Sequence, residues 1–163
     1  MDAFLQVFAA LGAARVRYLV IGGVATALHG IPRMTADIDL AISLDEENAR
    51  RAMEALLALG FLPRAPVNAL DFADSAKRET WVAEKSLIAF SLYRNDPVPI
   101  EVDVLAEAQF DFEDAWTDKL VKEISEVTVN ILDKRRLIEM KERSARPNDL
   151  EDASALRRSE DDR

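Results

Sequence analysis

The stretch "YLVIGGVATALHGIPRMTADIDLAI", residues Tyr18 to Ile42, contains the features that decide the fold. An apolar run ends at two glycines, and the short helical pattern that follows is stopped by Gly30 and Pro32. The stretch closes on "DIDLAI", in which one isoleucine separates two aspartates. This order predicts a buried strand, a helix opened by glycines, and a second strand that carries two carboxylates.

The two aspartates of the second strand, Asp37 and Asp39, are expected to share one face of the sheet. Side chains alternate along a strand, so Ile38 and Leu40 point to the other face and into the core. Aspartate is a poor strand former, and an apolar run that contains two of them is unusual. The pattern therefore favours metal binding over two solvated acids at a sheet edge.

The segment "IEVDVL", residues 100–105, alternates strictly and predicts another half-buried strand. Its acids, Glu101 and Asp103, fall on the face opposite the apolar residues. If this strand lies beside "DIDLAI", Asp103 joins Asp37 and Asp39 in one patch, with Glu101 as an alternative ligand or a neighbour. Close carboxylates raise each other's pKa values, and a divalent cation removes that penalty. Oxygen ligands suit Mg²⁺, with Mn²⁺ as an alternative.

The glycine pair, Gly22 and Gly23, follows a strand and opens a helix. Backbone N–H groups at the start of a helix form a site for phosphate oxygens, and the missing Cβ atoms allow a triphosphate to approach closely. Two metal ions held by carboxylates can activate a hydroxyl and stabilise the leaving oxygen of a phosphoryl displacement. The combined pattern predicts nucleotide chemistry.

The remaining sequence mixes helical and strand patterns. "TWVAE" and "SLIAFSLYR", residues 80–84 and 86–94, are read as a hairpin. The predicted fold class is α/β (α+β), a mixed sheet with helices mainly on one face. Residues 1–158 are expected to form a single domain, and residues 159–163 a frayed tail.

Composition excludes several classes of function. The chain has 163 residues, a net charge of −9 and no cysteine, which excludes disulfides, thiolate zinc sites and thiol catalysis. No apolar run is long enough to span a membrane, and the N-terminus lacks the features of a secretory signal, so a cytoplasmic protein is expected. The basic runs are diluted by acids, which disfavours non-specific binding of DNA or RNA.

These motifs resemble the nucleotidyltransferase fold of the DNA polymerase β superfamily, and within it the AbiEii-like branch, often toxins of toxin–antitoxin systems. The resemblance covers most of the chain. The first matched positions are the glycine pair, an Arg-x-Thr step and the three metal carboxylates: Gly22, Gly23, Arg33, Thr35, Asp37, Asp39 and Asp103. A later motif in "LIEMKERSARPNDLEDASAL" matches at Lys141, Arg146, Asp149 and Asp152.

Several of these positions have two interpretations. Arg33 either clamps a phosphate or pairs with an acid. Thr35 either contacts the nucleotide or caps the local backbone. The resemblance gives Lys141 a role at the nucleotide phosphates or in a structural pair with Asp149 or Asp152, and both acids are expected to be structural. The single histidine, His29, is left outside the chemistry.

The resemblance implies a Mg²⁺-dependent transferase that moves an NMP from an NTP, ATP among them, to a hydroxyl acceptor. Asp37, Asp39 and Asp103 would be both metal ligands and catalytic residues. The acceptor would be RNA, protein or a small molecule, and an antitoxin or a second copy of the chain would be the partner. Larger members of the branch continue with a helical region that this sequence lacks. The alternative is a catalytically silent binding protein that acts in a complex.

Overall fold

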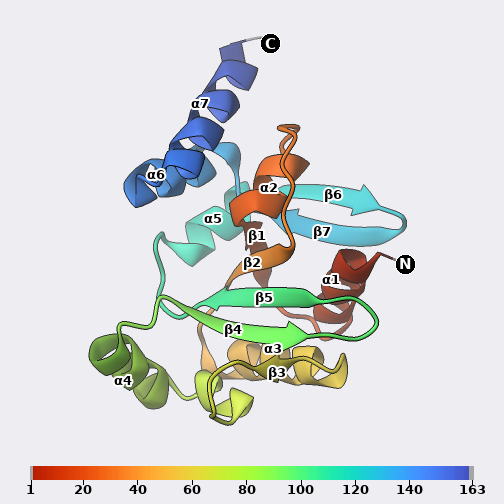
Figure 1. The fold of residues 1–163 in the computed structure, drawn as a ribbon, viewed down its shortest axis with the longest axis vertical. Helices are drawn as coiled ribbons and strands as arrows, with labels where there is room; N and C mark the ends of the chain where they lie inside the picture. The colour runs from red at the N-terminus through yellow and green to blue at the C-terminus, as the bar shows by residue number, and fades with distance from the viewer. Residues whose placement is uncertain (1, 162–163) are drawn as a thin grey trace.

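The computed structural model describes residues 2–161 and is built on one mixed sheet of seven strands (Figure 1). The strand order is β3-β4-β5-β2-β1-β7-β6. Only the pairs β2–β5 and β1–β7 are parallel, and the other neighbours run antiparallel. The predicted α/β class with a mixed sheet is confirmed.

The strands are β1 (Tyr18–Ile21), β2 (Asp37–Ile42), β3 (Leu62–Pro63), β4 (Ala89–Arg94), β5 (Ile100–Leu105), β6 (Leu120–Ile124) and β7 (Val127–Ile131). The α-helices are α1 (Ala3–Ala13), α2 (Gly22–Leu28), α3 (Glu46–Ala58), α4 (Ser75–Lys85), α5 (Phe112–Asp118), α6 (Lys134–Ser144) and α7 (Pro147–Asp161), with a 3-10 helix, η1 (Ala69–Ala73).

Aspartate side chains begin most of these helices. In each case the carboxylate accepts a hydrogen bond from a backbone N–H of the first turn, which would otherwise lack a partner. These N-caps are Asp2, Asp45, Asp74, Asp111 and Asp133. Part of the acidic excess of the chain is therefore used to define where helices start.

The two faces of the sheet differ in character. On β2 and β5 the residues Ile38, Leu40, Val102 and Val104 are fully buried. Helix α1 covers this apolar face, where Phe8 stacks on Tyr18 with ring centroids 6.0 Å apart. The opposite face carries the carboxylates, and α6, which packs on α2 and α7, stands beside it (Figure 1).

The expected hairpin at residues 80–94 is wrong in its first half. "TWVAE" belongs to α4, which Asp74 caps, and Ser86 ends the helix in the left-handed conformation. Trp81 of α4 stacks on Phe90 of β4 at 5.7 Å, so the apolar residues of both segments meet as helix against sheet. Strand β4 pairs instead with β3 and β5. Strand β6, which pairs with β7, is a further element that the sequence pattern did not predict.

Helix α7 ends at Asp161, so it enters the segment 159–163 that was expected to fray. Residues 162 and 163 lie outside the described part of the chain. Among residues 2–161, no helix is both long and apolar enough to cross a membrane.

Candidate active site

Two carboxylates lie side by side at the centre of the sheet. Strands β2 and β5 are parallel neighbours, and their register places Asp39 directly opposite Asp103. The alternation predicted from the sequence is observed, because the flanking residues of both strands are buried. Ser91 on β4 donates a hydrogen bond to Asp103 at 2.5 Å, which fixes one oxygen of that carboxylate.

The third predicted carboxylate, Asp37, lies at the exposed start of β2, opposite Glu101. Glu101 accepts two hydrogen bonds from Arg64, at 2.8 and 2.6 Å. The guanidinium of Arg64 also lies over the Tyr93 ring, 4.7 Å from its centroid. Arg64 therefore neutralises Glu101, and the other three acids of this face have no cationic partner this close within the described residues.

The environment of the central pair disfavours ionisation. Burial raises the pKa of Asp39 to about 6, and the charges of Asp103 and Asp37 add to the effect. Burial also raises the pKa of Asp103, although the hydrogen bond from Ser91 opposes the shift. Such shifts are characteristic of sites that bind a cation or transfer a proton.

Position 22 requires glycine because the Asp39 carboxylate packs directly against it. Its φ of +66° is unfavourable for other residues, and a Cβ placed there would lie 2.2 Å from Oδ2 of Asp39. A Cβ on Gly23 would lie 3.2 Å from Cβ of Thr35. The first glycine thus lets the strand carboxylate pack directly against the start of α2.

A cleft of about 370 Å³ opens over the central pair. Gly22, Asp39 and Asp103 form one side of it, and Lys141 and Arg146 lie on the other side, which α6 and the start of α7 supply. The cleft thus brings together two of the predicted carboxylates, one predicted glycine and three residues of the later motif, the third being Asp149. Asp37, Gly23, Arg33 and Thr35 do not line it.

The later motif forms a buried ion-pair cluster that joins α6 to α7. The ammonium of Lys141 lies 2.9 Å from Asp152 and 3.5 Å from Asp149. Arg33 approaches the same oxygen of Asp152 at 3.6 Å. Lys141 and Asp152 are only 5% and 7% exposed. Lys141 and Arg33 thus follow the ion-pair interpretation here, although Lys141 still borders the cleft.

Thr35 follows its local interpretation. Its hydroxyl donates to the Asp37 carbonyl at 3.1 Å and accepts from the Asp37 N–H at 3.3 Å. This turn sets the entry into β2 and presses Thr35 against Gly23. The residue therefore shapes the loop beside the carboxylates.

Two residues of the site were missed as functional candidates, and a third, Arg146, was matched from the sequence without being given a role. Arg146 is exposed and lines the cleft, and only its place in the later motif pointed to it. Ser91 and Arg64 contact Asp103 and Glu101 from other segments. No local sequence signal marks these two, because their role depends on the register of β3, β4 and β5.

The chemistry of Asp39 and Asp103 fits a hard divalent cation. Both are partly desolvated carboxylates with raised pKa values, and a cation would relieve their repulsion. Asp37 is close enough for its charge to raise both pKa values. Within residues 2–161, however, no three His, Cys, Asp or Glu side chains are gathered as a ligand cluster. The three-ligand site stays a prediction.

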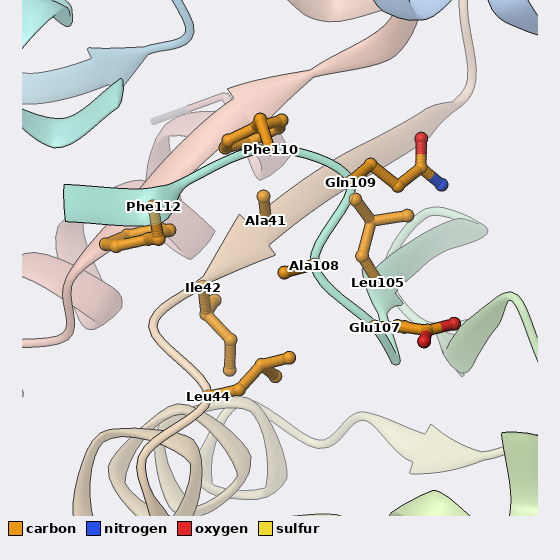
Figure 2. Close-up of a pocket in the computed structure, with 9 residues that line it drawn as sticks. All are labelled: Ala41, Ile42, Leu44, Leu105, Glu107, Ala108, Gln109, Phe110 and Phe112. Carbon is orange, nitrogen blue, oxygen red and sulfur yellow. The ribbon is translucent and has the colours of Figure 1, made fainter. Parts of the chain in front are cut away.

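An apolar pocket of about 60 Å³ adjoins the cleft (Figure 2). Its floor is Ala41 and Leu105, which follow Asp39 and Asp103 on the same face of β2 and β5. Figure 2 shows Phe110 from the loop after β5 placed beside Ala41. Leu105 and Gln109 line both spaces, so the polar cleft passes directly into an apolar one.

No protein-family model matches the sequence, and no curated protein matches it either. Solved structures do match. A nucleotidyltransferase-like protein from Paracoccidioides brasiliensis superposes with a TM-score of 0.57 at 20% identity, over 93% of this chain and 74% of that one. A candidate nucleotidyltransferase from Thermotoga maritima gives 0.57 at 18% identity, over 98% and 91%. A lincosamide antibiotic adenylyltransferase with bound lincomycin gives 0.56 at 12% identity, over 90% and 89%. The chain therefore has the nucleotidyltransferase fold.

Proposed function

We propose that this protein is a Mg²⁺-dependent nucleotidyltransferase that moves an NMP from an NTP to the hydroxyl group of an acceptor. The observation that carries the proposal is the Asp39–Asp103 pair, set against Gly22 in a cleft that Arg146 also lines. The same fold occurs in an adenylyltransferase of lincosamide antibiotics, which supports this class of reaction.

The chain's own residues would divide the work as follows. The open backbone at Gly22 lets the triphosphate approach, and Arg146 supplies a guanidinium that can bind phosphate oxygens in pairs. Asp39 and Asp103, with Asp37 nearby, would hold Mg²⁺. When bound, Mg²⁺ neutralises charge on the phosphates and on the carboxylates.

Asp103 would also accept the proton of the acceptor hydroxyl. Burial raises its pKa, which makes the carboxylate a better base, while Ser91 fixes its orientation. The acceptor oxygen then forms a bond to the α-phosphorus, the bond to the pyrophosphate oxygen breaks, and pyrophosphate leaves. Positioning and charge stabilisation supply most of the acceleration.

The test is transfer of label from each α-labelled NTP, with Mg²⁺, to components of a cell extract. Asp39→Asn and Asp103→Asn are expected to lower transfer by about 100-fold or more, because each removes charge at the reacting centre. Asp114→Asn, an exposed acid on α5, is the matched control and should retain activity. Full transfer by either site variant would contradict the proposal.

Label transfer combined with calorimetry tests the second function, a catalytically silent binding protein. This alternative is favoured by one observation, namely that Asp37 does not gather with Asp39 and Asp103 as a third ligand among the described residues. Nucleotide binding by calorimetry, without label transfer to any acceptor, would select it. Membership of the AbiEii-like branch, with an antitoxin or a second copy as partner, belongs to the proposal and is supported by the motif at Lys141 to Asp152.

A further inference from the structure

A second hollow, of about 330 Å³, lies at the opposite end of α2 from the glycine pair. Three lysines from separate segments line it: Lys119 before β6, Lys122 on β6 and Lys134 at the start of α6. We call this site the lysine hollow. Lys134 begins a short basic run, residues 134–136, but Lys119 and Lys122 join it only in the folded chain.

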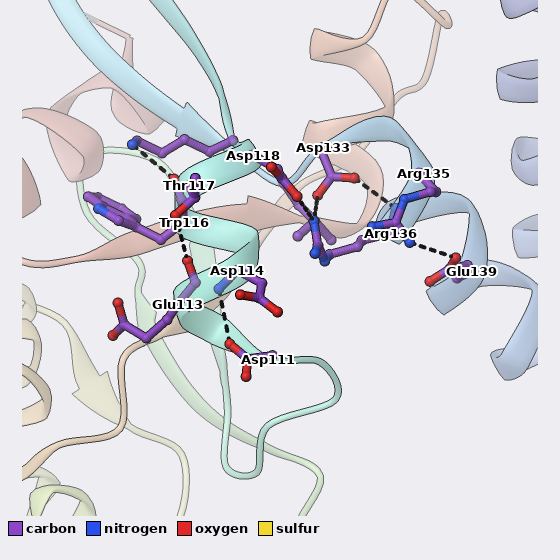
Figure 3. A network of polar contacts seen from close by, with 12 residues as sticks. Asp111, Glu113, Asp114, Trp116, Thr117, Asp118, Asp133, Arg135, Arg136 and Glu139 are labelled. Atoms are coloured by element: carbon purple, nitrogen blue, oxygen red, sulfur yellow. Dashed lines mark hydrogen bonds and ion pairs between the residues drawn. The ribbon is translucent and has the colours of Figure 1, made fainter.

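The lysine hollow has an excess of positive charge in an acidic protein. Its two acids, Asp118 and Asp133, both bind Arg136 at 2.8 Å (Figure 3). The lining therefore holds three lysines against two acids, and Arg136, which lies beside the hollow and binds both acids, raises the local excess from one positive charge to two. The chain as a whole carries a net charge of −9, so this local sign is the reverse of the overall one.

The three ammonium groups are held by neutral partners. Lys119 donates to the backbone carbonyl of Trp116 at 3.1 Å, and its ammonium lies 4.1 Å from the centroid of the Trp116 ring. Lys122 donates to the Leu28 carbonyl, and Lys134 donates to the Ser159 hydroxyl at 2.9 Å. Within residues 2–161, none of the three lysines forms an ion pair. Their charges are positioned but not neutralised.

His29 also borders the lysine hollow but adds no charge at neutral pH. Its Nε2 lies 2.7 Å from the Leu132 carbonyl, which can only accept, so this nitrogen carries the hydrogen. Burial lowers the pKa of His29, and the charges of Lys134 and Lys122 lower it further, while the hydrogen bond to the Leu132 carbonyl and the charge of Asp133 oppose the shift. The lysines are therefore the groups that an anion would meet.

Two helices connect the lysine hollow to the cleft. Gly22 at the start of α2 lines the cleft, and Leu28 at its end lines the hollow. On the adjacent α6, Lys134 lines the hollow and Lys141 lines the cleft. Seven helical residues span roughly 10 Å, so the two sites are about this far apart.

We propose that the lysine hollow binds a backbone phosphate of a nucleic-acid acceptor whose terminal hydroxyl lies at Asp39 and Asp103. The inference rests on the proposed function and narrows its acceptor to a phosphate-bearing strand. The phosphates of the NTP occupy the cleft itself, and a small neutral acceptor has no anion to place roughly 10 Å away. A nucleic-acid strand carries phosphates at regular intervals and meets both sites.

Binding of a short fluorescein-labelled single-stranded RNA, measured by anisotropy at several salt concentrations, tests this inference. Lys119→Gln/Lys122→Gln is compared with Lys77→Gln/Lys85→Gln on α4, which removes the same charge elsewhere. We expect the hollow variant to bind about 10-fold more weakly, and its slope of log K against log salt to shrink by about 1.4. The α4 variant should match the wild type in both.

Equal weakening by both double variants, or by neither, would overturn the inference. A third arm measures binding of ATP with Mg²⁺. Loss of ATP binding in the hollow variant, with RNA binding intact, would make the hollow a nucleotide site instead. The single variant Lys122→Gln, on an exposed position of an edge strand, repeats the RNA test without altering the contact of Lys119 with Trp116.

RNA binding requires no turnover, so this test is independent of the label-transfer assay. Weaker RNA binding in the hollow variant together with absent transfer would leave the hollow in place and remove the enzyme. Intact label transfer, with RNA binding unchanged in the hollow variant, would support the enzyme and overturn the role of the lysine hollow.

Discussion

Asp39 combines an environment that disfavours its charge with a central position in the proposed site, and the two are linked. The carboxylate is partly buried beside two other acids, and Gly22 leaves only enough space for it to fit. Such an arrangement costs stability in the empty protein and becomes favourable when a cation is bound. Substitutions of Asp39 and of Gly22 test separately the cost of the buried charge and the need for space beside it.

Asp39→Asn should stabilise the metal-free protein at neutral pH. The folded pKa of Asp39 is raised to about 6 from 3.8, so the folded state binds the proton more tightly and loses stability as pH rises through this window. Above pH 6 the penalty is complete, and removing it is worth about 1–3 kcal/mol. Urea unfolding in a chelator should show this gain at pH 7.5 and none at pH 3.5. A gain that is equal at both values would contradict the assignment.

Gly22→Ala should both destabilise the fold and abolish Mg²⁺-dependent nucleotide binding. The new Cβ would overlap Oδ2 of Asp39, and the left-handed φ adds strain, for a cost of about 1–3 kcal/mol. Gly12→Ala in α1 is the control, because a Cβ added at that residue would meet nothing within 4 Å. That change should be neutral or stabilising by up to about 1 kcal/mol. Thermal unfolding and calorimetry measure both, and similar behaviour of the two variants would refute the role given to Gly22.

At the scale of elements, α6 and α7 are joined by a buried charge cluster. Lys141→Met should destabilise the protein by about 3–5 kcal/mol, because it leaves the buried Asp152 without its nearest cation. Arg135→Met on the same helix removes an exposed i,i+4 pair with Glu139 and should cost less than about 0.5 kcal/mol. Chemical denaturation compares them.

A second variant separates the ion pair from simple packing. Lys141→Met/Asp152→Leu removes both charges and should recover most of the lost stability. If the double variant is no more stable than Lys141→Met, the pair does not hold the helices together through its charges.

Local pattern predicted elements well where one periodicity dominates. The alternation in "IEVDVL" and the glycines before α2 predicted these elements within a few residues. "TWVAE" was misread because its β-branched and aromatic residues favour a strand, whereas the Asp74 cap and the packing of Trp81 on Phe90 select a helix. Packing against a distant strand is not readable from five residues.

For the whole molecule, the nucleotidyltransferase fold was predictable because its first motif falls on the consecutive elements β1, α2 and β2, and Asp103 and the later motif follow in the expected order. The meeting of Asp39 with Asp103 needed only the assumption that β2 and β5 are neighbours. The pairing of Arg33 with Asp152 and the convergence of the lysine hollow were not predictable. Both depend on how the last two helices and β6 return to the start of the chain.

The sheet order also determines how the site responds to fluctuations. Strands β2 and β5 each have a neighbour on both sides, whereas β3 and β6 are the edges. Amide protons at the edges exchange with solvent through local opening, but those of the central strands exchange only when most of the sheet separates. We therefore expect the carboxylates to lie on the slowest-exchanging strands, and β6, which carries Lys122, to exchange faster.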